Sequence, residues 1–236
     1  MVGIFVILIP FVTVSGNPPK STLQSEYMTT HQMRFLALGD SYTIGEGVAE
    51  SDRWPVQLVR LLNERNIDVD DPVIIARTGW TTDELDRAID QAEPKGGFDL
   101  VSLLIGVNNQ YRGRSEKEYR AEFSELLQRA IGFADGNRQR VIVLSIPDWG
   151  VTPFANGRDR AKISAEIDSF NSIKHEETVK AGAQFIDVTP ISRKALNDRS
   201  MLASDGLHPS PKMYAEWVRL VLPISASILS EQHQPD

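Results

Sequence analysis

Three side chains of this sequence have the types and spacing that nucleophilic acyl transfer requires. Ser41 follows Gly39-Asp40 in a segment flanked by glycines, which leaves its hydroxyl accessible as a nucleophile. Histidine is the side chain that most often accepts a proton near neutral pH, and His208 provides one. Asp205 precedes it by three residues, close enough in a tight turn to accept a hydrogen bond from the imidazole. Such a bond fixes the tautomer of the base, so the sequence predicts a Ser-His-Asp triad.

Acyl transfer also needs donors for the negative charge that develops on the carbonyl oxygen. We expect them to be the backbone amide of Ser41, the backbone amide of Gly79 and the side-chain amide of Asn108. Gly79 suits this role because a residue without a side chain lets a substrate approach the backbone closely. The sequence therefore predicts an oxyanion hole made by three separate segments.

Alternating strands and helices are predicted to position these groups. The strands are expected at 34–38, 72–76, 98–105, 141–146 and 184–188, and the helices at 54–65, 82–92, from 115, 159–181 and from about 209. Continuous apolar strands separated by helices indicate a parallel sheet covered on both faces. Ligands of such open sheets bind beyond the carboxyl ends of the strands, where the chemically active segments fall.

These segments resemble the motifs of the SGNH (GDSL-type) hydrolases. Gly39-Asp40-Ser41 is similar to that family's first block, Gly79 and Asn108 follow in the family's order, and Asp205-x-x-His208 is similar to its last block. The resemblance covers about residues 33–225, and each motif falls at a strand end or a helix start.

The resemblance implies an α/β fold, namely a flavodoxin-like three-layer α/β/α sandwich with a central parallel sheet of about five strands. It implies an esterase or lipase that cleaves carboxylic esters or thioesters through an acyl-enzyme, without a cofactor. It assigns to Ser41, Asp205 and His208 the catalytic triad, and to Ser41, Gly79 and Asn108 the oxyanion hole.

Two positions depart from the family pattern. Tyr42-Thr43 follows the nucleophile where the family often has leucine. The third block reads Gly106-x-Asn108-Asn109, where the family commonly ends in aspartate. Asn109 cannot supply the charge of that aspartate, so the sequence leaves open how this loop is braced.

Aromatic residues that follow the strands could line a substrate cleft or simply pack on the core. We predict Trp80, Tyr111 and Trp149 as substrate-binding residues, whereas a core position is favoured for Phe154.

Other polar residues have plainer interpretations. Asp40 is expected to brace the nucleophile loop, and Gly45-Glu46-Gly47 lacks the spacing of a phosphate-binding loop. Asp187 and Asp198 are rival orienting acids without the local turn spacing of Asp205. Arg77 could neutralise an anionic substrate or a strand end, and Asn171 and His175 are expected on a solvated helix face.

The composition of the chain limits the classes of partner and cofactor that it is expected to bind. The chain has 236 residues, 41% of them hydrophobic, which suffices for one sizeable α/β core. A net charge of −7 without a basic stripe argues against nucleic-acid partners. The absence of cysteine excludes disulfides and thiol catalysis, and the four histidines lack metal-ligand spacing, so no metal is expected. A small-molecule ester is the expected partner.

The amino-terminal segment is expected to lie outside the fold. The apolar run at 3–14 is too short to span a bilayer but suits a signal-peptide core, although no Lys or Arg precedes it. We divide the chain into an extension at 1–32, a hydrolase domain at 33–230 and a tail at 231–236. If residues 1–16 are a signal peptide the protein is secreted or periplasmic, and otherwise it is cytoplasmic. No stable membrane insertion is expected, and the oligomeric state is left open.

Substrate loops cannot be traced from sequence, so several functions stay open. A carbohydrate deacetylase, a lysophospholipase or a thioesterase would use the same residues, as would acyl transfer to an alcohol. A non-catalytic binding module is the alternative from a different class, and it has no need of nucleophile, base, acid and oxyanion donors together.

Overall fold

The computed structural model describes residues 32–231, and its centre is a parallel sheet in the order β2-β1-β3-β4-β5. The strands are β1 (Phe35–Gly39), β2 (Val73–Ala76), β3 (Leu100–Leu104), β4 (Val141–Leu144) and β5 (Gln184–Ile186). Every residue of β1, β3 and β4 is buried, whereas the edge strands β2 and β5 are partly exposed. Central strands that are buried along their whole length need cover on both faces, and the helices provide it.

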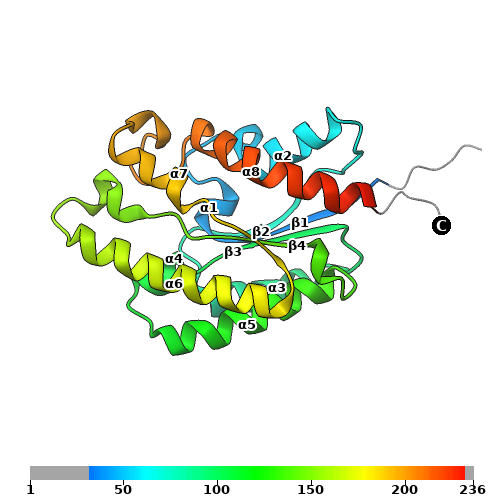
Figure 1. The fold of residues 1–236 in the computed structure, drawn as a ribbon, viewed down its shortest axis with the longest axis horizontal. Helices are drawn as coiled ribbons and strands as arrows, with labels where there is room; N and C mark the ends of the chain where they lie inside the picture. The colour runs from blue at the N-terminus through cyan, green and yellow to red at the C-terminus, as the bar shows by residue number, and fades with distance from the viewer. Residues whose placement is uncertain (1–31, 232–236) are drawn as a thin grey trace, which may run out of the picture. The chain divides into compact units, whose positions relative to one another are not determined.

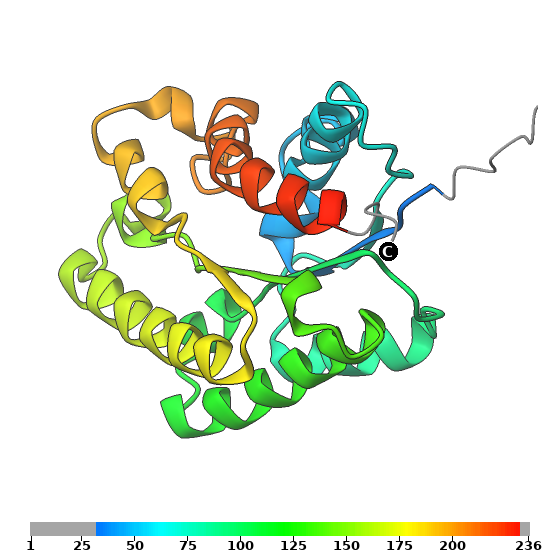
Figure 2. The same ribbon diagram turned by 45° about the vertical axis from the view of Figure 1, so that its right-hand side comes forward.

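Two layers of helices enclose the sheet. Helices α2 and α8 pack together on one face, and α3, α5 and α6 cover the other (Figure 1). A second view, turned about the vertical axis, shows the two layers apart, with α8 in red above the sheet and α5 and α6 in green and yellow below it (Figure 2). Their bounds are α2 (Trp54–Asn63), α3 (Thr82–Ala92), α5 (Glu116–Phe133), α6 (Arg160–Ala181) and α8 (Pro211–Ser230). The result is the expected three-layer α/β/α fold.

Three short helices lie where strands end, and the sequence did not predict them. They are α1 (Ser41–Ile44), α4 (Val107–Tyr111) and α7 (Thr189–Arg193). Four or five residues complete little more than one turn, so no hydrophobic period can reveal them. Single 3₁₀ turns occur at Glu50–Asp52, Arg138–Arg140, Trp149–Val151, Pro153–Ala155, Lys194–Leu196 and Arg199–Met201.

The expected strand lengths needed correction. The apolar runs at 98–105 and 141–146 suggested longer strands than β3 and β4, whose ladders stop at Leu104 and Leu144. The residues beyond them are buried too, so burial alone does not mark where hydrogen bonding ends.

Whether the chain contains a membrane-spanning helix can be judged for residues 32–231 only. In this range no helix is both long and apolar enough to cross a bilayer. The apolar run at 3–14, the proposed signal peptide and most of the tail at 231–236 lie outside the described residues.

Candidate active site

Ser41 is held at the carboxyl end of β1 by a tight turn into α1. The Asp40 carboxylate accepts the backbone N–H of Tyr42 at 3.0 Å, and the Asp40 carbonyl accepts the N–H groups of Thr43 and Ile44. This N-cap makes Ser41 the first helical residue, and 5% of its surface is exposed. Asp40 therefore braces the loop, as the sequence suggested.

The Asp40 carboxyl group is fully buried. Burial raises its pKa to about 7, while the Tyr42 N–H and the charge of Lys174 act in the opposite direction. Lys174 is itself completely buried, and burial lowers its pKa to about 7. Its ammonium group donates to the carbonyl oxygens of Ile105 at 3.2 Å and Leu144 at 2.5 Å. One helix side chain thus joins the ends of β3 and β4 beside the nucleophile loop.

Asp205 and His208 lie on a loop that is closed at its base. Leu202 and Pro209 form an antiparallel bridge, and within the loop Asp205 accepts the backbone N–H groups of Leu207 and His208 at 2.9 and 3.0 Å. The other oxygen of Asp205 lies 2.6 Å from Nδ1 of His208. Partial burial opposes ionisation of Asp205, but these hydrogen bonds together hold its pKa below the usual value. The arrangement leaves Nε2 of the imidazole to face another group.

One cavity brings the distant segments together. It has a volume of about 160 Å³, and six of the residues predicted for the site line it, namely Ser41, Gly79, Asn108, Tyr111, Trp149 and His208. The remaining lining residues are Tyr42, Thr78, Val107, Phe154 and Leu207. The carboxyl ends of β1, β2 and β3 therefore meet the loop before α8, as expected for a parallel sheet.

The donors expected for an oxyanion have suitable surroundings. Within residues 32–231, the backbone N–H groups of Ser41 and Gly79 have no hydrogen-bond acceptor. Gly79 has a φ of 88°, a left-handed conformation that favours glycine, and Arg112 holds its carbonyl oxygen at 2.6 Å. Asn108 donates one N–H to the carbonyl of Trp80 at 2.9 Å, which leaves its second N–H for another acceptor.

Aromatic rings form one wall of the cavity. The ring centroids of Tyr111, Trp149 and Phe154 lie 5.5 to 6.1 Å apart. The Arg158 guanidinium lies 5.1 to 5.4 Å from all three rings and donates to the Tyr111 hydroxyl at 3.1 Å. Phe154 is 42% exposed, so the core position favoured from sequence is wrong. Trp80 lies outside this lining and packs against the core.

Comparison with known proteins identifies the family of this chain. A family model described as "GDSL-like Lipase/Acylhydrolase family" matches residues 37–216. The chain belongs to this family. The GDSL-type protein is thus a hydrolase of the class that its four motifs resemble.

Solved structures show the same fold. The crystal structure of TesA aligns with a TM-score of 0.63 and 19% identity over 83% of this chain and 99% of that chain. The acetylxylan esterase Axe2 from Geobacillus stearothermophilus aligns with a TM-score of 0.63 and 18% identity over 82% of this chain and 94% of that chain. The esterase EstA from Pseudoalteromonas sp. aligns with a TM-score of 0.60 and 17% identity over 84% of this chain and 98% of that chain. A search of curated protein sequences finds no match.

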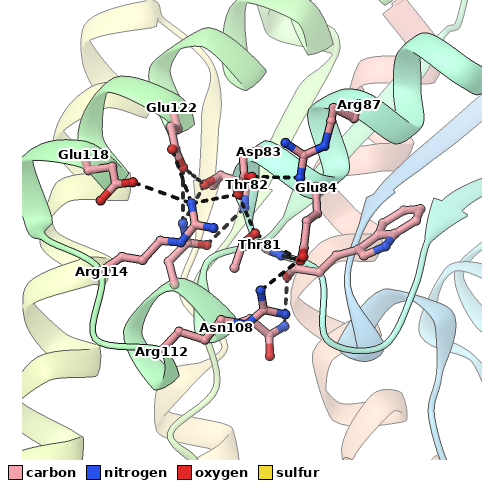
Figure 3. Close-up of polar contacts among 12 residues, drawn as sticks. Thr81, Thr82, Asp83, Glu84, Arg87, Asn108, Arg112, Arg114, Glu118 and Glu122 are labelled. Carbon is pink, nitrogen blue, oxygen red and sulfur yellow. Dashed lines mark hydrogen bonds and ion pairs between the residues drawn. The ribbon is translucent and has the colours of Figure 1, made fainter.

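The departure at position 109 of this GDSL-type protein is accommodated by a polar network behind the cavity. Asn109 is fully buried, and its amide accepts the backbone N–H of Thr82 at 3.1 Å and donates to the Thr82 hydroxyl at 2.6 Å. That hydroxyl donates to the carboxylate of Glu122 on α5. Figure 3 shows Thr82 and Glu122 together with Arg114, whose guanidinium lies among three carboxylates. The network links α3, α4 and α5 next to Asn108.

The rival acids have partners of their own. Asp187 accepts hydrogen bonds from Ser145 at 2.8 Å and from the N–H of Thr189 at 3.0 Å. Asp198 accepts the ammonium of Lys212 at 2.6 Å. Asp205 is the acid that contacts the imidazole. No group of three or more His, Asp or Glu side chains suited to a metal ion occurs in the described part of the chain.

Of the two residues expected on a solvated helix face, Asn171 differs from the expectation and His175 agrees with it. Asn171 is not a solvated residue, because its amide bonds to both the N–H and the carbonyl of Ile146, at 2.7 and 3.0 Å. It thereby fixes the chain just after β4. His175 is exposed and lies edge-on to Phe185.

Sequence reasoning missed several residues around the cavity. Tyr42, Thr78, Val107 and Leu207 line it, and each is next to a residue that we had singled out, which is the signal that could have identified them. Lys174 and Glu122 lie on long helices rich in charged residues, and nothing in the local pattern distinguishes them from solvated neighbours.

Proposed function

We propose that this protein hydrolyses carboxylic esters of short acyl groups, with Ser41 as nucleophile, His208 as general base and Asp205 as the orienting acid. One observation carries the proposal: Ser41 and His208 line the same cavity, with Asp205 bonded to Nδ1 of the histidine at 2.6 Å. The family match supports ester hydrolysis, and the details of the triad are our inference from the geometry.

The mechanism follows from these positions. The Ser41 hydroxyl attacks the ester carbonyl while Nε2 of His208 accepts its proton, and Asp205 stabilises the imidazolium. The tetrahedral anion accepts hydrogen bonds from the N–H groups of Ser41 and Gly79 and from the Asn108 amide. Collapse breaks the bond to the alcohol, which takes the proton from His208. Water then attacks the acyl-enzyme with the same base, releases the acid and restores the serine.

The size of the cavity favours short acyl groups. Its volume of about 160 Å³ resembles that of an apolar cavity of about 150 Å³ that binds benzene, so it holds roughly six heavy atoms. A fatty acyl chain would have to extend into solvent. This argues for small esters or acetylated sugars, and the exposed faces of Tyr111 and Phe154, 45% and 42%, could stack on a sugar.

A series of p-nitrophenyl esters from acetate to palmitate tests the proposal. We expect kcat/KM to be highest for acetate to hexanoate and to fall by about tenfold or more by laurate, because the longer chains gain no further buried contact. Acetylated xylo-oligosaccharides test the deacetylase alternative in the same assay. Equal or higher kcat/KM for palmitate would refute the short-chain preference.

Covalent labelling tests the nucleophile independently of the substrate. A fluorophosphonate should label Ser41, as read by peptide mass spectrometry, since the relative EstA was solved inhibited by monoethylphosphonate. Absence of labelling, together with no hydrolysis of any ester, would refute the proposed function and favour a binding module.

Replacing Asn108 tests the oxyanion hole. We expect Asn108→Ala to lower kcat by about 10²–10³ with little change in KM, because the lost N–H contributes mainly in the transition state. The matched control is Asn137→Ala, at the N-cap of the 3₁₀ turn before β4. An unchanged kcat for Asn108→Ala would remove this residue from the oxyanion hole.

A further inference from the structure

We propose that Glu122 on α5 is a positioning residue that holds the Asn108 donor in place through Thr82 and Asn109. The carboxylate supplies, from a different helix, the negative charge that position 109 lacks. The inference rests on the proposed ester hydrolysis for its kinetic consequence, and on the hydrogen-bond network alone for its structural part.

Asn109 connects the donor loop to the start of α3. It directly follows Asn108, it is fully buried, and both ends of its amide bond to Thr82. Thr82 follows Trp80 by two residues, and the Trp80 carbonyl accepts the amide of Asn108. Movement of Asn109 would therefore displace Asn108 and the segment that carries Gly79 together.

The Thr82 hydroxyl gives this network a direction. A hydroxyl has one proton to donate, and here it accepts from Nδ2 of Asn109 and donates to the Glu122 carboxylate. Nδ2 of Asn109 also lies 3.4 Å from the same Glu122 oxygen. Hydrogen bonds to an ionised acceptor are stronger than those between neutral groups, so the carboxylate fixes the orientation of the buried amide.

Charge at the outer end of the network agrees with this role. The Arg114 guanidinium lies 3.5 Å from the other oxygen of Glu122, 2.8 Å from Asp83 and 3.6 Å from Glu118 (Figure 3). Glu122 is 24% exposed at its side chain and Glu118 is 48% exposed. Glu122 thus reaches inward to Thr82, whereas Glu118, one turn earlier on α5, contacts Arg114 at the surface.

The geometry allows one carboxylate at this junction but not two. An aspartate at position 109 would place its oxygen where Nδ2 now lies, 3.4 Å from a Glu122 oxygen, with one hydroxyl proton for both. Like charges at that distance in a half-buried place repel strongly. A neutral amide at 109 and a charge at 122 are therefore complementary, and exchanging them should preserve the network.

A charge-exchange cycle tests this inference on the full chain. The variants are Glu122→Gln, Asn109→Asp and the double variant, with Glu118→Gln as the matched control that also removes a carboxylate partner of Arg114. For each we would measure kcat and KM on p-nitrophenyl acetate and the midpoint of urea unfolding.

We expect each single variant of the pair to lower kcat by about tenfold with little change in KM, because the donor is displaced rather than the substrate pocket closed. Glu118→Gln should retain wild-type kcat. The double variant should recover kcat to within about threefold of wild type, since one charge and one amide are again present. A kcat for Glu122→Gln equal to that of Glu118→Gln, or a double variant no better than Asn109→Asp, would overturn the proposal.

Two features keep the test decisive. If the wild-type protein hydrolyses no ester, the proposed function fails. The urea midpoints still test the hydrogen-bond network, because the double variant should unfold at a higher urea concentration than Asn109→Asp.

If Asn109→Asp does not fold, Thr82→Val and Thr82→Ser replace it. Thr82→Val should lower kcat as Glu122→Gln does, whereas Thr82→Ser keeps the hydroxyl and should retain activity. Equal kcat for the two threonine variants would contradict the inference.

Discussion

Replacing Ser41 with alanine is expected to lower kcat on p-nitrophenyl acetate by about 10⁴–10⁶-fold while the protein remains folded. The hydroxyl is the group that would form the acyl-enzyme, and alanine has none. The fold should persist because the N-cap of α1 comes from Asp40, and alanine is a good residue at the first helical position. Steady-state kinetics and circular dichroism of the same preparation measure both effects.

Loss of the base should resemble loss of the nucleophile. We expect His208→Ala to reduce kcat to a similar degree, and the double variant Ser41→Ala/His208→Ala to lose little more than either single one, since the two side chains act as one unit. Ser51→Ala, at an exposed position before α2, is the control. Hydrolysis by Ser41→Ala at the wild-type rate would end the proposed mechanism, whatever the state of the other residues.

The central part of the fold could be predicted because its sequence signals are strong. The strands β1, β3 and β4 are buried along their whole length, and runs such as Phe98–Ile105 and Val141–Ile146 have no alternative except a buried helix. The breaks at Gly106 and Pro147 decided between the two. Short helices at the strand ends could not be foreseen, because a single turn has no period.

The residues expected at the site were accessible to sequence reasoning for two reasons. Asp205 and His208 are neighbours in the chain, so a local turn suffices to join them. Ser41, Gly79 and Asn108 each follow a strand, and a parallel sheet carries all such segments to one edge. Their catalytic roles remain predictions, which the variants above test.

Residues that support the site from helices were not accessible in this way. Lys174 is followed on α6 by His175 and Glu176 and reads as part of a solvated face, yet it is completely buried. Phe154 reads as core and is exposed at the cavity. In both cases the outcome depends on how a helix or a loop packs against segments far away in the chain, which no local period encodes.

Lys174 provides the second large expected effect, on stability. We expect Lys174→Met to lower the free energy of unfolding by about 3–5 kcal/mol, because it leaves the two buried carbonyl oxygens of Ile105 and Leu144 without their donor and removes the charge that opposes the raised pKa of Asp40. In a domain of this size that corresponds to roughly 6–20 °C in the midpoint of thermal unfolding. Urea and thermal unfolding at neutral pH measure it.

A lysine elsewhere on α6 separates this effect from loss of charge alone. Lys180 is 81% exposed at its side chain and lies 3.7 Å from Glu177, so Lys180→Met should change the free energy of unfolding by no more than about 0.5 kcal/mol. If Lys174→Met unfolds at the same urea concentration as Lys180→Met, the buried ammonium does not stabilise the strand ends.

The double variant Asp40→Asn/Lys174→Met shows how much of the effect is electrostatic. Asparagine keeps the oxygen that accepts the Tyr42 N–H, so the turn at Ser41 is retained, but it removes the buried charge that Lys174 offsets. We therefore expect the double variant to be more stable than Lys174→Met alone, with a coupling of about 1–3 kcal/mol between two side chains from different layers of the fold. Simple additivity would mean that the lysine acts only through the carbonyl oxygens of Ile105 and Leu144, whereas coupling would mean that the electrostatic interaction between Lys174 and Asp40 also contributes to stability.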